Sequence, residues 1–135
     1  MGRSLLACLA GLVLGSVVIG VVEFVGHQIY PPPAGIDPRD PESIRRAMET
    51  ISMGALLVVL VAWAIGSVVG GLVAARLAPR QPMRCALIVG AMLLLAGIAN
   101  LIMLPHPLWF SIVAVLLFLP AAWLGGRLAR AKGGV

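Results

Sequence analysis

Residues 51–75 read ISMGALLVVLVAWAIGSVVGGLVAA and contain no charged side chain over 25 positions. An α-helix rises about 1.5 Å per residue and the hydrocarbon core of a bilayer is roughly 30 Å thick, so about 20 apolar residues cross it. This stretch therefore predicts a transmembrane helix. Three further runs are also free of charge and of similar length, at 5–22, 85–104 and 108–126.

The composition of the 135-residue chain agrees with a membrane protein, because 61% of the residues are hydrophobic and only 11% are charged. A soluble domain needs far more polar surface than this. We expect an all-α integral membrane protein with one domain, residues 1–135, whose four transmembrane helices form two antiparallel hairpins. The predicted spans cover about 5–29, 51–76, 84–104 and 108–128.

The basic residues stand at the ends of the apolar runs, and their distribution predicts the topology. Although the net charge is +5, the basic residues are not gathered into a patch of the kind that binds nucleic acid. Seven basic residues flank the spans on one predicted side of the membrane, and three lie in the loop after the first span. The positive-inside rule therefore places both termini in the cytoplasm. The cytoplasmic set is Arg3, Arg76, Arg80, Arg84, Arg127, Arg130 and Lys132.

The outer loop, residues 31–50, begins with three prolines that end the first helix and favour a polyproline-like linker. Asp40 and Pro41 then match the N-cap and first residue of a short amphipathic helix. Nothing between Pro41 and Ala78 is a strong helix breaker, so we expect this helix to run directly into the second span. Pro120 should kink the fourth span.

Small residues recur at four-residue spacing in several spans, which lets helix backbones approach closely in lipid. Two uses stay open for these stripes. They can pack one four-helix bundle, or they can join copies of the chain into a homo-oligomer. The glycines concerned are Gly11, Gly15, Gly20, Gly66, Gly70, Gly71 and Gly126.

Glu23 is the only carboxylate that falls within a predicted span, and burying such a charge in a bilayer is costly. If the span centres near Gly15, Glu23 lies about 12 Å from the midplane, close to the outer interface. One interpretation is a structural role in which the side chain reaches water. The other is a ligand-binding or proton-linked role.

Further polar residues are predicted at the same depth as Glu23. His27 follows Glu23 by four residues, so the two share a helix face and can form a hydrogen bond. Tyr30, Asn100 and His106 fall on the same outer side, and we expect all five to line an outward-facing polar cup. The alternative is that each is an interfacial residue that meets lipid headgroups.

The sequence contains no motif of a known enzyme class, metal site or cofactor site. We therefore predict no enzymatic activity, no metal and no cofactor. A haem held by His27 and His106 is disfavoured, because His106 lies in a turn between two prolines. The cytoplasmic half of the spans offers only Ser16 and Ser67 as polar residues, which argues against a continuous pore in one subunit.

The run Glu-Phe-Val-Gly-His-Gln-Ile-Tyr-Pro-Pro at 23–32, with Gly70-Gly71, Asn100 and Pro105-His106-Pro107, resembles a family of small uncharacterised bacterial inner-membrane proteins with four spans. The resemblance implies a bacterial inner-membrane location but no activity. In its charged first span the chain is also similar to the small multidrug-resistance exporters. However, Glu23 lies far along its span, and the outer loop is longer than theirs.

These features lead to two expectations about function. The first is an accessory, assembly or ligand-binding membrane component that uses the outward-facing cup. The alternative is a homodimeric ion or small-solute transporter with Glu23 as the coupling carboxylate. The expected partners are the lipid bilayer and either a second copy of the chain or a larger membrane complex, and no nucleic acid is expected.

Overall fold

The computed structural model of the chain describes residues 1–132, which fold into five helices and no strand. Four of the helices are long and apolar enough to cross a membrane, as a multipass membrane protein requires. This confirms the prediction of an all-helical chain with four helices that could span a membrane. The helices are α1 (Gly2–Ile29), α2 (Pro41–Glu49), α3 (Met53–Leu77), α4 (Pro82–Met103) and α5 (Leu108–Ala131).

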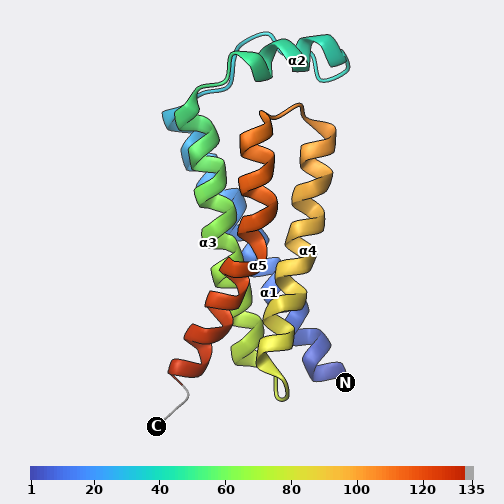
Figure 1. Cartoon of the computed structure of the whole chain (residues 1–135), viewed down its shortest axis with the longest axis vertical. Coiled ribbons are helices and arrows are strands. Elements are labelled where there is room, and N and C mark those ends of the chain that lie inside the picture. The colour runs from blue at the N-terminus through green and yellow to red at the C-terminus, as the bar shows by residue number, and fades with distance from the viewer. Residues whose placement is uncertain (133–135) are drawn as a thin grey trace.

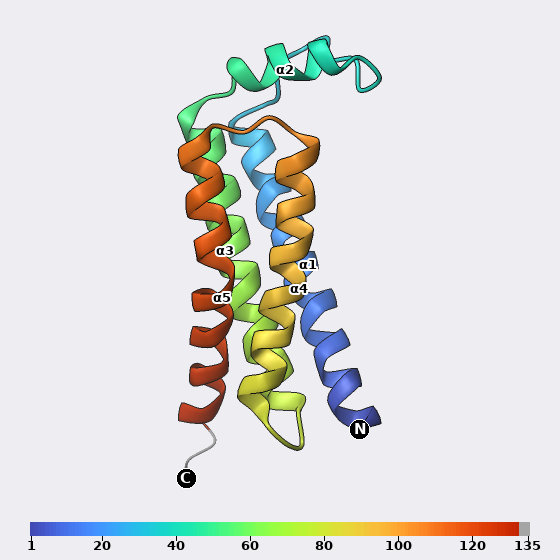
Figure 2. The ribbon, with the colours of Figure 1, turned by 45° about the vertical axis from the view of Figure 1, so that its right-hand side comes forward.

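The four long helices stand side by side, and consecutive ones run in opposite directions (Figures 1 and 2). Helix α2 lies across one end of this bundle, and the N-terminus of the chain lies at the other end. The central helix is α3, which contacts α1, α4 and α5. Helix α1 packs mainly on α3 and touches α4 less extensively.

Glycines bring α1 and α3 into backbone contact. A Cβ atom added at Gly11 would lie 2.5 Å from the Gly70 carbonyl oxygen, and one added at Gly15 would lie 2.8 Å from the Gly66 carbonyl oxygen. Real Cβ atoms are not found this close to a backbone oxygen. The two helices can therefore keep this separation only with glycine at these positions.

Glycines also set the contacts of α5 with α3 and α4. A Cβ atom at Gly71 would collide with the Ala122 backbone, and one at Gly126 would lie 2.9 Å from the Cβ of Ala86. Gly20 differs from the other six predicted packing glycines, because within residues 1–132 no atom from outside its own stretch of helix lies within 4 Å of its Cβ position. Its side of α1 faces away from α3, so Gly20 does not pack against another helix of this chain.

The prediction of one continuous helix from Pro41 into the second span is wrong. Helix α2 ends at Glu49, and the Thr50 hydroxyl donates a hydrogen bond to the Ala47 carbonyl at 2.9 Å. Ser52 then adopts an extended conformation and caps α3, its hydroxyl accepting from the Ala55 amide at 3.2 Å. Two side chains that bond the backbone locally thus end one helix and begin the next.

Aromatic residues fill the part of the core nearer α2. Trp63 of α3 packs against Phe110 and Phe118 of α5, with ring centroids 5.7 Å and 5.2 Å apart. Helix α5 stays continuous through Pro120, and Figure 1 shows its lower half leaning away from the line of its upper half. The exposed surface of the bundle is rich in large apolar side chains, including Leu5, Leu95 and Leu116, which suits contact with lipid.

Candidate functional site: two cavities that share Glu23

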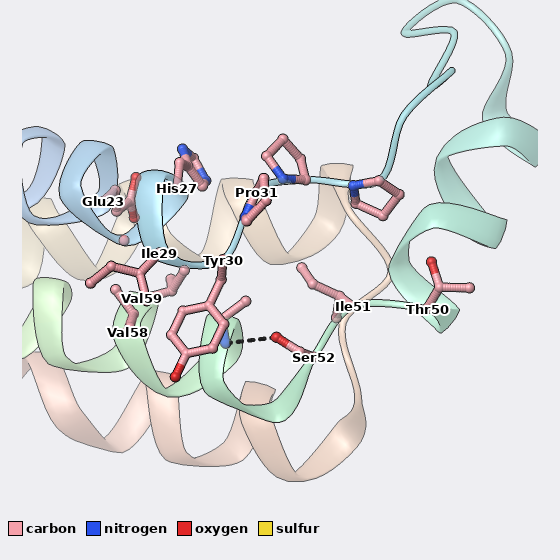
Figure 3. Close-up of a pocket in the computed structure, with 14 residues that line it drawn as sticks. Glu23, His27, Ile29, Tyr30, Pro31, Thr50, Ile51, Ser52, Val58 and Val59 are labelled. Atoms are coloured by element: carbon pink, nitrogen blue, oxygen red, sulfur yellow. Dashed lines mark hydrogen bonds between the residues drawn. The ribbon is translucent and has the colours of Figure 1, made fainter.

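A cavity of about 320 Å³ lies where α1 ends and α3 begins (Figure 3). The Pro31–Pro33 segment and the approach to α3 complete its wall. Gly54 makes room for the Tyr30 ring, because a Cβ atom there would lie 2.5 Å from Tyr30 Cζ. The cavity is lined by Glu23, Gly26, His27, Ile29, Tyr30, Pro31, Pro32, Pro33, Thr50, Ile51, Ser52, Ala55, Val58 and Val59.

Glu23 is half-buried on α1 and bonds to the core of the bundle. Its Oε1 atom accepts a hydrogen bond of 2.9 Å from the indole Nε1–H of Trp63 on α3. Among residues 1–132, no ion pair includes this carboxylate, and Oε2 accepts no hydrogen bond. Glu23 therefore has one satisfied oxygen and one that is free to meet a cation or a proton.

A second cavity, of about 220 Å³, lies between α1 and α4 and has α3 and α5 as its floor. Of the residues that the structure describes, Glu23 is the one that lines both this cavity and the first. Its carboxylate therefore stands at the junction between the C-terminal end of α1 and the side of the bundle. The second cavity is lined by Ser16, Ile19, Glu23, Trp63, Leu93, Ala96, Gly97, Asn100 and Phe118.

The residues of the predicted polar cup do not all share one cavity. Glu23, His27 and Tyr30 line the first cavity, whereas Asn100 lines the second together with Glu23. His106 lines neither. His106 instead stacks on Phe110, which packs against Trp63 of the aromatic core.

His106 lies in the turn between α4 and α5, outside the long helices. Its Nδ1 atom is 2.9 Å from the Leu104 carbonyl oxygen, and its ring stacks on Phe110 with centroids 4.7 Å apart. Burial lowers the pKa of His106 below its ordinary value of 6.5, and the hydrogen bond to Leu104 opposes this only in part. His106 is therefore a packed ring whose burial favours the neutral form.

Trp63 is a residue of the site that the sequence analysis missed. The sequence analysis considered only His27, on the same face of α1, as a residue that can form a hydrogen bond with Glu23, and the partner is Trp63. One signal could have found it: a buried indole N–H in a span needs an acceptor, and Glu23 is the only carboxylate within the spans.

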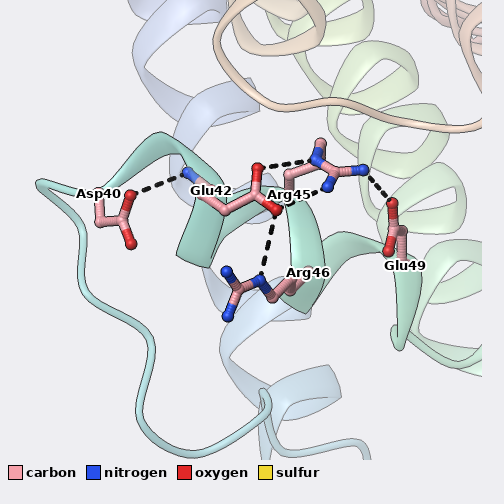
Figure 4. Close-up of polar contacts among 5 residues, drawn as sticks. All are labelled: Asp40, Glu42, Arg45, Arg46 and Glu49. Atoms are coloured by element: carbon pink, nitrogen blue, oxygen red, sulfur yellow. Dashed lines mark hydrogen bonds and ion pairs between the residues drawn. The ribbon is translucent and has the colours of Figure 1, made fainter.

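The charged residues of α2 pair with one another (Figure 4), and none of them lines either of the two cavities that share Glu23. Arg45 contacts Glu42 at 2.6 Å and Glu49 at 2.7 Å, and Arg46 contacts Glu42 at 3.4 Å. The hydrogen bond from Arg45 is the main cause that lowers the pKa of Glu42 to about 2. Within these pairs the positive and negative charges neutralise each other. Glu23 is the acidic residue that lines the two cavities.

Comparisons with protein families, with curated proteins and with solved structures find no match for this chain. The geometry of the two cavities is therefore the basis for assigning a function.

Proposed function

We propose that this chain is a small multipass protein of the bacterial inner membrane that binds an organic cation in the cavity between α1 and α3. In this proposal the four long helices cross the bilayer as two antiparallel hairpins. Both termini lie in the cytoplasm, and the cavity opens on the outer side.

The topology is supported by the placement of basic residues. Arg76, Arg80 and Arg84 lie around the α3–α4 turn, at the end of the bundle opposite α2. The Arg residues of the outer segment are balanced by neighbouring carboxylates, as in the pairs of Arg45 with Glu42 and Glu49. The excess of positive charge thus marks the α3–α4 turn and both termini as cytoplasmic.

The observation that carries the ligand proposal is the state of the Glu23 carboxylate. It is half-buried at membrane depth, it accepts one hydrogen bond from Trp63, and it has no cationic partner among residues 1–132. A charge that is removed from water needs such a partner. A bound cation would supply it, in a cavity of about 320 Å³, which is within the usual range for small-molecule sites.

The other walls of the cavity suit an organic cation better than a metal ion. They are mainly apolar, with Ile51, Val58 and Val59 beside the three prolines, and Tyr30 adds an aromatic ring. Aromatic faces attract ammonium groups, by about 0.5–2 kcal/mol. A metal ion would need several further oxygen or nitrogen ligands.

A homodimeric transporter is a second candidate, and one observation favours it. Glu23 faces both cavities, so its carboxylate is placed to pass an ion or a proton from one to the other. A transporter of this kind should carry out Glu23-dependent flux in sealed vesicles. A binding or accessory protein should retain ligand affinity without flux.

The test uses the full chain in nanodiscs and measures its affinity for benzyltrimethylammonium by calorimetry. We expect saturable binding that Glu23→Gln weakens at least tenfold, because this change removes the charge and keeps the shape. The matched control is Glu49→Gln, which removes an exposed carboxylate of α2. Equal affinity in the wild type and Glu23→Gln would overturn the proposal, as would equal binding of neopentylbenzene, the uncharged analogue.

A further inference from the structure

The second cavity is a groove between two parallel helices. Near their first turns α1 and α4 approach closely, with the Cys85 sulfur 4.0 Å from the Ser4 carbonyl oxygen. Farther along, from Ser16 on α1 and Ala96 on α4, the cavity lies between them. Ser16 and Ala96 are exposed, so the groove opens sideways on the bundle. At this depth in a membrane-spanning helix, a sideways opening faces lipid.

The surfaces of the groove suit an apolar chain. The floor is formed by Trp63 and Phe118, and Ile19 and Leu93 contribute to the walls. Its volume of about 220 Å³ is smaller than that of a single helical turn, which is about 10 Å wide with its side chains and about 5.4 Å long. An extended hydrocarbon chain fits these dimensions, and a helix from a second copy of this protein does not.

The groove adjoins the proposed cation site at a single residue. Glu23 lines both cavities, so a positive head group at its carboxylate can direct a tail into the groove. Asn100 also lines the groove and offers a polar contact near the head group. Charge complementarity at Glu23 thus fixes which end of an amphiphilic molecule lies at the junction.

We infer that the ligand is a single-chain amphiphilic cation that reaches Glu23 from the bilayer and places its hydrocarbon tail in the α1–α4 groove. The inference rests on the proposed function, since it requires a cation at Glu23. It adds the class of ligand and the side of the bundle from which the ligand enters.

The test locates the tail by photo-crosslinking. The probe is an octyltrimethylammonium ion with a diazirine at the end of its tail, added to the full chain in phosphatidylcholine nanodiscs. After irradiation, mass spectrometry maps the labelled residues. We expect labels at residues 16–19 of α1 or 93–100 of α4. Excess benzyltrimethylammonium should reduce this labelling at least fivefold, because both molecules need Glu23.

Two matched substitutions on α4 test the groove itself. Ala96 lines the groove and Ala99 does not, although both are exposed on the same helix. Ala96→Phe should fill the groove and reduce the labelling at least fivefold, and Ala96→Leu should have a smaller effect in the same direction. Ala99→Phe should leave the labelling unchanged.

The outcomes separate this inference from the proposed function. Labelling outside the groove, or labelling that Ala96→Phe does not change, would overturn the groove as the tail site. Benzyltrimethylammonium binding that persists in that case would leave the cation site at Glu23 intact. If benzyltrimethylammonium neither binds nor competes, both the cation site and the tail site are overturned.

Discussion

The indole nitrogen of Trp63 donates a hydrogen bond of 2.9 Å to Oε1 of Glu23, across 40 positions of sequence. This bond joins α1 to α3 and holds the carboxylate against the aromatic core. Trp63 in turn packs on Phe110, and Phe110 stacks on His106. Glu23 and His106, which the sequence assigns to one cup, are thus connected through two aromatic rings, Trp63 and Phe110, instead of a shared cavity.

Replacing Trp63 by Phe tests the energetic role of this hydrogen bond. The ring contacts with Phe110 and Phe118 can largely remain, but the donor to Glu23 is lost. We expect the free energy of unfolding in detergent to fall by about 1–3 kcal/mol. A double-mutant cycle with Glu23→Gln measures the coupling. Strictly additive effects of the two substitutions would contradict a direct Glu23–Trp63 bond.

The glycine contacts predict opposite effects at two positions. In Gly125→Ala the new Cβ would meet the Val68 carbonyl oxygen and would lie 2.7 Å from the Leu72 backbone nitrogen. Because both atoms belong to the α3 backbone, we expect a loss of about 2 kcal/mol or more in unfolding free energy. Gly20→Ala meets no neighbour and should be neutral or stabilising by up to about 1 kcal/mol.

Thermal unfolding of both glycine variants in one detergent makes the comparison. A Gly125→Ala protein as stable as the wild type would contradict the close α3–α5 approach. A clear loss of stability in Gly20→Ala would contradict the assignment of that side of α1 as free of protein contacts.

The lowered pKa of His106 predicts a pH dependence of stability. Above the ordinary value of 6.5 the residue is neutral in both folded and unfolded chains. As pH falls below 6.5, the unfolded chain gains a proton that the folded chain resists, so stability falls until pH passes the lower folded-state pKa. His106→Gln should remove this part of the pH dependence of the unfolding free energy. An unchanged profile in His106→Gln would contradict the assignment.

The ion pairs of α2 predict an acidic titration of Glu42. Its pKa of about 2 lies below the ordinary value of 4.5, so its contribution to the stability of α2 is complete above 4.5 and is lost as pH falls through about 2. Carboxyl ¹³C NMR of labelled glutamate measures this titration. Arg45→Gln should move the pKa of Glu42 back toward 4.5. A wild-type titration near 4.5 would show that the pair with Arg45 does not form.

The apolar runs of the sequence predicted the four long helices well, because chain length without charge is a strong signal for a membrane span. The observed α3, Met53–Leu77, differs by one or two residues from the predicted 51–76. The break between α2 and α3 was missed, because Thr50 and Ser52 end and cap helices through local hydrogen bonds that no breaker residue announces. Cap formation depends on the backbone conformation as well as on residue type.

The candidate site was only partly predictable. Depth along each helix is readable from sequence, and Glu23, His27 and Tyr30, predicted at similar depth, line one cavity. Tertiary packing sets the rotation of each helix about its own axis, and it also sets which helices are neighbours. For this reason the sequence could not separate Asn100 and His106 from that group, and it could not identify Trp63 as the partner of Glu23.

The most direct test of cation binding observes the Glu23 carboxylate itself. The chain has only three glutamates, Glu23, Glu42 and Glu49, so carboxyl ¹³C NMR of glutamate-labelled protein in nanodiscs resolves few signals. We predict that benzyltrimethylammonium shifts the Glu23 signal saturably, that neopentylbenzene does not, and that the Glu42 and Glu49 signals stay in place. A Glu23 signal that does not move, or that moves equally with the uncharged analogue, would contradict a cation site at Glu23.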